Sequence, residues 1–137
     1  MKNNINLRDG LDNRQLRIHF LYQVYLFNNS QSKAIEELRN DRYYLFTNDQ
    51  KKVIIEILKN KQQTEKAILK VLPTNWKWIR FGNIEKAILL NAATEILIFK
   101  SKKAVAINEA IIFTKKYCDQ KTPALINAIL DNLKKEI

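Results

Sequence analysis

The sequence contains few of the residues on which many folds and active sites depend. Among its 137 residues there are only two glycines and two prolines. Gly10 and Gly82 stand alone, so the chain cannot build a glycine-rich loop that cradles phosphates or a dinucleotide. The same shortage argues against a β-sandwich, whose many short strands need turn-forming residues. These absences exclude enzymes that bind nucleotides through such loops, and they leave helices as the expected structure.

The residues that build metal and nucleophilic sites are equally scarce. His19 is the only histidine and Cys118 the only cysteine, whereas a zinc site takes three or four protein ligands. A Cys–His nucleophilic pair has no supporting signature, and a lone cysteine forms no intramolecular disulfide. We expect His19 to be packed within an apolar helix and Cys118 to be half-exposed. The sequence therefore predicts no catalytic residues, no metal site and no cofactor, and it indicates a binding protein rather than an enzyme.

Long hydrophobic runs are also absent. The N-terminal segment MKNNINLRDGLDNR lacks the apolar region of a signal peptide. The longest apolar stretch, Ile84–Phe99, is interrupted by Glu85, Lys86, Asn91 and Glu95, so we do not expect it to cross a membrane. The sequence predicts a cytoplasmic protein.

Positive charge is what the sequence has in excess. The chain carries 24 basic and 14 acidic side chains, a formal net charge of +10. A surplus of this size indicates a polyanionic partner, more often nucleic acid than an anionic membrane. Lysine, isoleucine and asparagine are abundant together, at 18, 18 and 15 copies, which A+T-rich coding would also produce. Residues 1–47, 48–82 and 83–137 are each net basic, so the charge belongs to the body of the protein rather than to a tail.

Helical periodicity runs through most of the chain. Apolar residues near the C-terminus recur at helical spacing at Ile126, Ile129, Leu130, Leu133 and Ile137. We predict six earlier helices, over about 13–28, 31–40, 49–60, 64–73, 83–99 and 104–118. We expect Thr122 to be the N-cap of the last helix, with Pro123 at its first position. Asp12 and Gln15 resemble a capping box for the first helix, and Asn83 a cap for the fifth.

The fold class follows from these patterns. The segment 83–99 is apolar on most of its circumference, which is typical of a helix surrounded by other helices. The sequence predicts an all-α helical bundle of about seven helices, with a seam between two halves near Pro73–Trp78.

The first predicted helix offers the most direct candidates for nucleic-acid contact. Arg14 and Arg17 are three residues apart and share a face, and arginine makes forked contacts with phosphates and guanine edges. We expect Tyr22 to offer a stacking surface to an unpaired base. We expect Phe20 and Phe27 to lie in the core.

Several segments carry a resemblance to a known family. Asn83–Leu89 and Ala92–Leu97 resemble the central helix of the NusB family of transcription antitermination factors. Val105–Ala110 is similar to the family's most recognisable string, and Leu125–Asp131 is similar to its last helix. The arginines and aromatics over 13–27 are similar to the family's first helix. The resemblance implies a single domain over 1–137 with two small helical subdomains, about 12–73 and 75–136, and no enzymatic activity.

The resemblance also implies partners. The family binds the boxA element of nascent single-stranded RNA together with ribosomal protein NusE, and the pair joins the elongating RNA polymerase on ribosomal RNA operons. By position, Arg14 and Arg17 match RNA-contacting arginines, and Lys121 and Leu125 border the same surface. The same resemblance matches Tyr25 and Glu85 to positions of NusE docking.

Other functions stay open at this point. Leu125 stands where the family frequently has an aromatic residue, and Asn13 where a further arginine is common. These departures favour, as an alternative, a protein–protein adaptor that binds NusE but has lost direct RNA binding. NusB-like domains also precede ribosomal RNA methyltransferase domains, but no strand pattern of such a domain is present. A basic helical protein that binds nucleic acid without sequence preference is the third alternative.

Overall fold

The computed structural model describes residues 10–134, with side chains from Asn13 onward, and consists of helices and connecting loops in that range. The helices are α1 (Gly10–Leu26), α2 (Gln31–Arg39), α3 (Asn48–Lys59), α4 (Lys61–Lys70), the short 3₁₀ helix η2 (Trp78–Arg80), α5 (Asn83–Leu97), α6 (Lys103–Tyr117) and α7 (Thr122–Asp131). Over these residues there is no strand. The predicted all-α class is confirmed.

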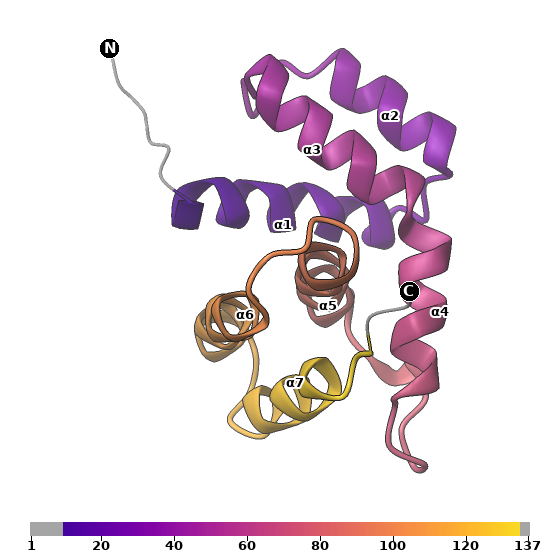
Figure 1. The fold of residues 1–137 in the computed structure, drawn as a ribbon. Coiled ribbons are helices and arrows are strands. Elements are labelled where there is room, and N and C mark those ends of the chain that lie inside the picture. Colours follow the sequence, from indigo (N-terminus) through magenta and orange to yellow (C-terminus); the bar gives the residue numbers. More distant parts are fainter. Residues whose placement is uncertain (1–9, 135–137) are drawn as a thin grey trace.

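Helix α5 occupies the centre of the molecule. It packs against α1, α4 and α6, and it also contacts α7, while α2 and α3 form a hairpin on the other side of α1 (Figure 1). Its residues from Ala87 to Ile96 are all buried. The sequence predicts this burial, because a helix that is apolar around most of its circumference needs neighbours on every side. No helix in the described range is both long and apolar enough to span a membrane.

The boundaries of the first helix differ from the prediction. Helix α1 begins at Gly10, so Asp12 lies inside the helix and the predicted cap at that position was wrong. The helix ends at Leu26, and Asn28 follows with a φ of 53°, a left-handed conformation that asparagine tolerates and that stops a helix. Phe20 is buried as predicted, but Phe27 is 66% exposed because it lies beyond the helix end.

Helix α4 also lies three residues earlier than predicted. Asn60 is at once the C-cap of α3 and the N-cap of α4, and its side-chain amide donates to the Glu56 carbonyl at 2.8 Å. One residue thus ends one helix and starts the next with no linker between them. The chain then leaves α4 at Lys70 and forms the loop that leads through η2 to α5.

Two predicted caps are displaced by one residue. Gly82, not Asn83, is the N-cap of α5, and the carboxylate of Glu85 accepts the Gly82 N–H at 2.8 Å. Lys121, not Thr122, is the N-cap of α7, so Pro123 is the second helical residue. The Asp119 carboxylate organises this second start, because it accepts the Lys121 N–H at 3.2 Å and the Thr122 hydroxyl at 2.8 Å.

The end of α7 is held by a lysine from α6. The helix stops at Asp131, and Leu133 is buried beyond it. Lys103 Nζ donates to the carbonyl of Asp131 at 2.5 Å and to that of Leu133 at 3.0 Å. A cation at the carbonyl end of a helix is the favourable arrangement. Ile137, which the periodicity included in this helix, lies outside the described residues.

Candidate nucleic-acid interface

The two arginines of α1 meet two polar residues of the buried helix α5. Arg14 donates through Nε and Nη2 to the two carboxylate oxygens of Glu95, at 2.9 and 2.8 Å. Arg17 donates through Nη2 to Glu95 Oε2 at 3.0 Å and through Nε to Asn91 Oδ1 at 2.7 Å. Asn91 in turn donates to Glu95 Oε2 at 3.0 Å. We call these four residues the arginine network.

The arginine network is largely withdrawn from solvent. Exposure of the side chain is 4% for Glu95, 18% for Arg14 and 13% for Arg17. Burial alone would raise the pKa of Glu95, but the hydrogen bonds and charges of the two arginines outweigh it and hold that pKa below its ordinary value. Burial lowers the pKa of Arg17, whereas the hydrogen bond to Glu95 raises that of Arg14. Both guanidinium groups stay charged at neutral pH.

A second carboxylate lies near the same arginines. Arg14 Nη1 is 3.9 Å from Glu109 Oε1 of α6, and Glu109 Oε2 is buried without a hydrogen-bond partner among the described residues. Two arginines and two glutamates therefore lie together and their formal charges cancel. This pairing was not predicted from the sequence. The signal for it was present, because Asn91 and Glu95 are polar residues one helical turn apart inside an otherwise apolar helix.

Tyr22 lines an open cleft of about 770 Å³ beside α1. The cleft is lined by Gln15, Leu16, Ile18, His19, Tyr22, Tyr43, Tyr44, Ile84 and Tyr117. The rings of Tyr22 and His19 stack with centroids 6.3 Å apart. His19 is exposed rather than packed inside its helix, because it lies on the outward side of α1 between buried Ile18 and Phe20, and its Nδ1 is hydrogen bonded to the Tyr44 hydroxyl at 2.7 Å.

The other two residues predicted to border the RNA surface lie on α7. Lys121 is exposed at the N-cap of the helix, and Leu125 is half-buried and packs against the core. No hydrogen bond or ion pair within residues 13–134 joins either of them to the arginine network. The structure thus brings Arg14 and Arg17 together, and it places Tyr22 in the cleft and Lys121 and Leu125 on a separate helix.

Tyr25 of α1 and Glu85 of α5, the residues predicted to dock NusE, already have internal partners, and the ammonium group of Lys86, next to Glu85, lies 5.9 Å from the centroid of the Tyr25 ring. The Tyr25 hydroxyl donates to Glu65 Oε2 at 2.5 Å, and its ring meets the Trp78 ring edge-on at 6.3 Å. Burial, then the charge of Glu65, raises the pKa of Tyr25. Glu85 accepts the Gly82 N–H through Oε1 and the Thr122 hydroxyl through Oε2 at 3.3 Å.

Comparison with known proteins identifies the family. The model of the NusB family matches residues 11–135. The chain belongs to the NusB family. This confirms the resemblance found in the sequence, and it places the chain in a family of transcription factors rather than in a known family of enzymes.

Individual relatives agree with this assignment. The chain is similar to transcription antitermination protein NusB of Sulfurovum sp., at 40% identity over 57% of the chain and 59% of that protein. It is 31% identical to that of Lactococcus lactis over 79% of the chain and 62% of that protein. With the Bacillus subtilis protein of the same name it shares 29% identity over 90% and 93% of the two chains. The matches to the first two relatives thus span about three-fifths of those proteins.

A solved structure supports the fold independently. The structure superposes on that of T. maritima NusB with a TM-score of 0.76, over 97% of this chain and 92% of the other. Sequence identity in that comparison is 20%. Such a match at low identity shows that the arrangement of helices is the NusB arrangement.

Proposed function

We propose that the protein is a transcription antitermination factor that binds boxA-like single-stranded RNA together with ribosomal protein NusE. The pair then joins the elongating RNA polymerase and supports transcription of ribosomal RNA. The observation that carries this proposal is family membership, with a relative named as an antitermination protein aligned over 90% of the chain. The net charge of +10 supports a polyanionic ligand.

In this proposal Arg14, Arg17 and Lys121 supply the phosphate contacts, Tyr22 supplies a stacking surface in the cleft beside α1, and the half-buried Leu125 borders the RNA from α7. Recognition of unpaired RNA combines phosphate contacts with base-edge and stacking contacts. The arginines are already neutralised by Glu95 and Glu109, so a phosphate adds to a network whose charges are balanced. We therefore expect weak RNA binding by the protein alone and tighter binding in the presence of NusE.

NusE docking is proposed for the surface around the first turn of α5, where Tyr25 and Glu85 lie. Glu85 offers a carboxylate to a basic ribosomal protein, and charge complementarity of this kind favours rapid and specific association. Both side chains are fixed by internal hydrogen bonds, so little conformational freedom is lost when a partner binds.

One observation favours a second candidate, a protein–protein adaptor that binds NusE without contacting RNA. Arg14 and Arg17 are the side chains best suited to phosphate contact. Their guanidinium groups already donate hydrogen bonds to Glu95 and Asn91, and these bonds join α1 to α5. In the adaptor, the arginine network is an internal structural feature only.

Fluorescence anisotropy of a labelled boxA-like RNA separates the two candidates. The RNA is titrated with the protein, with NusE and with an equimolar mixture, at two salt concentrations because affinity for RNA depends on salt. A scrambled RNA is the sequence control. Selective RNA binding that is tighter in the mixture supports the antitermination factor. If the mixture binds the RNA no more tightly than NusE alone, the adaptor is the better description.

The Arg14→Ala variant then tests the arginine. We expect weaker RNA binding and a salt dependence reduced by about one ion. Arg39→Ala is the matched control, because Arg39 is exposed on α2 and has the same charge. Thermal unfolding of both variants is measured alongside, since loss of Arg14 leaves the buried Glu95 with fewer partners. An unchanged affinity and salt slope in Arg14→Ala removes this residue from the interface.

A further inference from the structure

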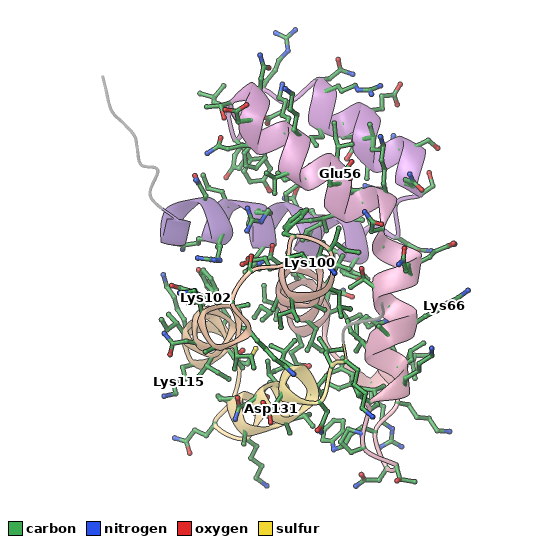
Figure 2. The ribbon with its side chains drawn as sticks, viewed as in Figure 1. Glu56, Lys66, Lys100, Lys102, Lys115 and Asp131 are labelled. Atoms are coloured by element: carbon green, nitrogen blue, oxygen red, sulfur yellow. The ribbon has the colours of Figure 1, made fainter. Side chains whose placement is uncertain are left out.

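The positive charge that is free to meet a ligand is not in the arginine network. Residues 48–82 carry eight basic and three acidic side chains. In this segment Lys66, Lys77 and Arg80 are exposed, and the ion pairs of residues 13–134 include none of them. Figure 2 shows Lys66 pointing outward from α4. The nearby carboxylate of Glu65 is already engaged, by the Tyr25 hydroxyl and by Lys61 at 3.2 Å.

An exposed aromatic ring shares a loop with Lys77 and Arg80, in residues 73–81, which we call the tryptophan loop. Trp76 is 39% exposed, and its ring is supported from behind by the buried Phe81, with centroids 5.5 Å apart and planes inclined by 34°. Ile79 is 83% exposed in the same loop. The loop thus carries one partly exposed ring, one exposed apolar side chain and, at Lys77 and Arg80, two exposed cations.

The tryptophan loop is held in one conformation. Backbone hydrogen bonds run from Trp76 N to the Pro73 carbonyl at 2.9 Å, and from Arg80 N to the Lys77 carbonyl at 2.9 Å. Trp78 anchors the loop from inside, because its ring packs on Phe81 at 5.8 Å and against the edge of Tyr25. A surface ordered in advance loses less entropy when it binds a ligand.

The tryptophan loop is distinct from the surface around Arg14. Tyr25, which touches Trp78, comes eleven residues after Arg14 in the same helix. At the rise of an α-helix this is about 16 Å along the α1 axis. Figure 1 shows the loop between α4 and α5 at the end of the molecule opposite the α2–α3 hairpin.

We propose that the tryptophan loop is a second contact surface for single-stranded RNA, with Trp76 stacking on an unpaired base and Lys77 and Arg80 contacting phosphates. Single-stranded nucleic acid is bound by this combination of cations that follow the backbone and aromatic rings on which bases stack. A flat ring with two cations in the same loop, and with the Glu65 carboxylate of α4 already engaged, fits RNA better than an acidic protein segment. The inference rests on the proposed RNA function and extends it to a longer RNA footprint.

The test uses the protein's own fluorescence. Its only two tryptophans, Trp76 and Trp78, both lie in the tryptophan loop, and the Trp78→Phe variant leaves Trp76 as the sole emitter. This variant is titrated with a fluorescein-labelled single-stranded RNA whose anisotropy reports binding anywhere on the protein. In parallel, unlabelled RNA is titrated and tryptophan emission is read. We expect Trp76 emission to be quenched over the same concentration range in which anisotropy rises.

Affinity of variants in the otherwise natural chain provides the second readout. Trp76→Ala should weaken RNA binding roughly tenfold, the effect of one lost base stack. The double variant Lys77→Ala with Arg80→Ala should lower the salt slope by about 1.4, since each phosphate contact to a single strand contributes about 0.7. The matched control, Arg39→Ala with Lys52→Ala, removes two positive charges from the α2–α3 hairpin. It should lower the salt slope much less.

Each outcome decides between the proposals. Anisotropy that rises while Trp76 emission stays constant, with full affinity in Trp76→Ala, overturns the second surface and leaves the proposed RNA function standing. If neither signal changes, either in the protein alone or in its mixture with NusE, both proposals are overturned. If NusE alters the emission but RNA does not, the tryptophan loop is a protein-binding surface, which overturns the second RNA surface and leaves the proposed RNA function to the anisotropy result.

Discussion

At the scale of single residues, Glu95 has the largest structural consequence. It is a carboxylate placed inside the most apolar helix of the chain, where an unpaired charge would be strongly destabilising. Its two oxygens accept hydrogen bonds from Arg14, Arg17 and Asn91. These directional bonds join α1 to α5 at one register, beside the apolar contacts that Ile18 and Leu21 of α1 make in the core.

Glu95→Gln should lower stability by about 1–3 kcal/mol at neutral pH, because the charge-assisted hydrogen bonds from both arginines are weakened. The stability lost in Glu95→Gln should depend on pH. The pKa of Glu95 lies below its ordinary 4.5 in the folded state, so its ionised form stabilises the fold above about pH 4.5, and this contribution is lost as the pH falls through the lowered pKa. Thermal unfolding of both proteins from pH 7 to pH 3 measures the difference. Glu56→Gln, at an exposed position of α3 (Figure 2), is the control. A pH-independent difference would contradict the assignment.

Cys118 should be an unreactive thiol in the folded protein. Burial, then the charges of Glu85 and Asp119, raises the pKa of Cys118 to about 11. At pH 8 this leaves roughly 0.1% of the reactive thiolate. We expect alkylation by iodoacetamide to be roughly 100-fold slower in the folded than in the denatured protein, as measured by mass spectrometry over time. Equal rates in the two states would show that the thiol is open to solvent.

At the scale of helices, the starts of α5 and α7 are linked through one side chain. Glu85 accepts the Gly82 N–H at the beginning of α5, and its other oxygen shares the Thr122 hydroxyl proton at the beginning of α7 with Asp119, at 3.3 and 2.8 Å respectively. Both helices thus begin at a shared polar junction. A carboxylate in the first turn also interacts favourably with the helix dipole.

Two substitutions at Glu85 should separate this structural role from the proposed docking of NusE. Glu85→Ala removes both hydrogen bonds and should lower stability by about 1 kcal/mol, the usual value of a helix cap. Glu85→Gln keeps an acceptor for Gly82 and should lose less stability. If the charge serves NusE, both variants should bind NusE more weakly by titration calorimetry. If Glu85→Gln binds NusE with full affinity, the role of Glu85 is limited to capping the start of α5.

The helices could be predicted because their signals are local, whereas their ends depend on residues with two roles. The central place of α5 follows from its own apolar residues. The start of α4 was missed because Asn60 serves as a cap for two helices, and the start of α7 because Asp119 supplies the capping oxygen. The pairing of Arg14 with Glu95 was missed for a different reason, since it joins residues 81 positions apart. Spacing within α1 shows which residues share a face, but not which helix that face meets.

At the scale of the whole molecule, the sequence suggests two halves but the packing joins them. Helix α5 lies in the second half of the chain and is covered on one side by α1 and α4 from the first half. Its buried residues Ile88, Leu89 and Ile96 are each fully enclosed. Separating the halves would expose this apolar surface to water, which is strongly unfavourable.

We therefore expect the chain to unfold in one cooperative transition. Far-UV circular dichroism reports all helices, and tryptophan emission reports the tryptophan loop between the halves, so the two signals should give the same midpoint. The calorimetric and van't Hoff enthalpies should also agree. Two separate transitions, with the tryptophan signal changing at the lower temperature, would show that the halves are independent domains.

The arginine network also has a consequence for synthesis on the ribosome. The N-terminal helix α1 is made first, but the carboxylate that satisfies its arginines is added 81 residues after Arg14. At roughly 5–20 residues per second this is a delay of about 4–16 s. During that interval the apolar face of α1 and both guanidinium groups are exposed on the nascent chain, with only α2, α3 and α4 available to cover part of them. The newborn protein is thus most vulnerable to misassembly, and most in need of a chaperone, before α5 leaves the exit tunnel.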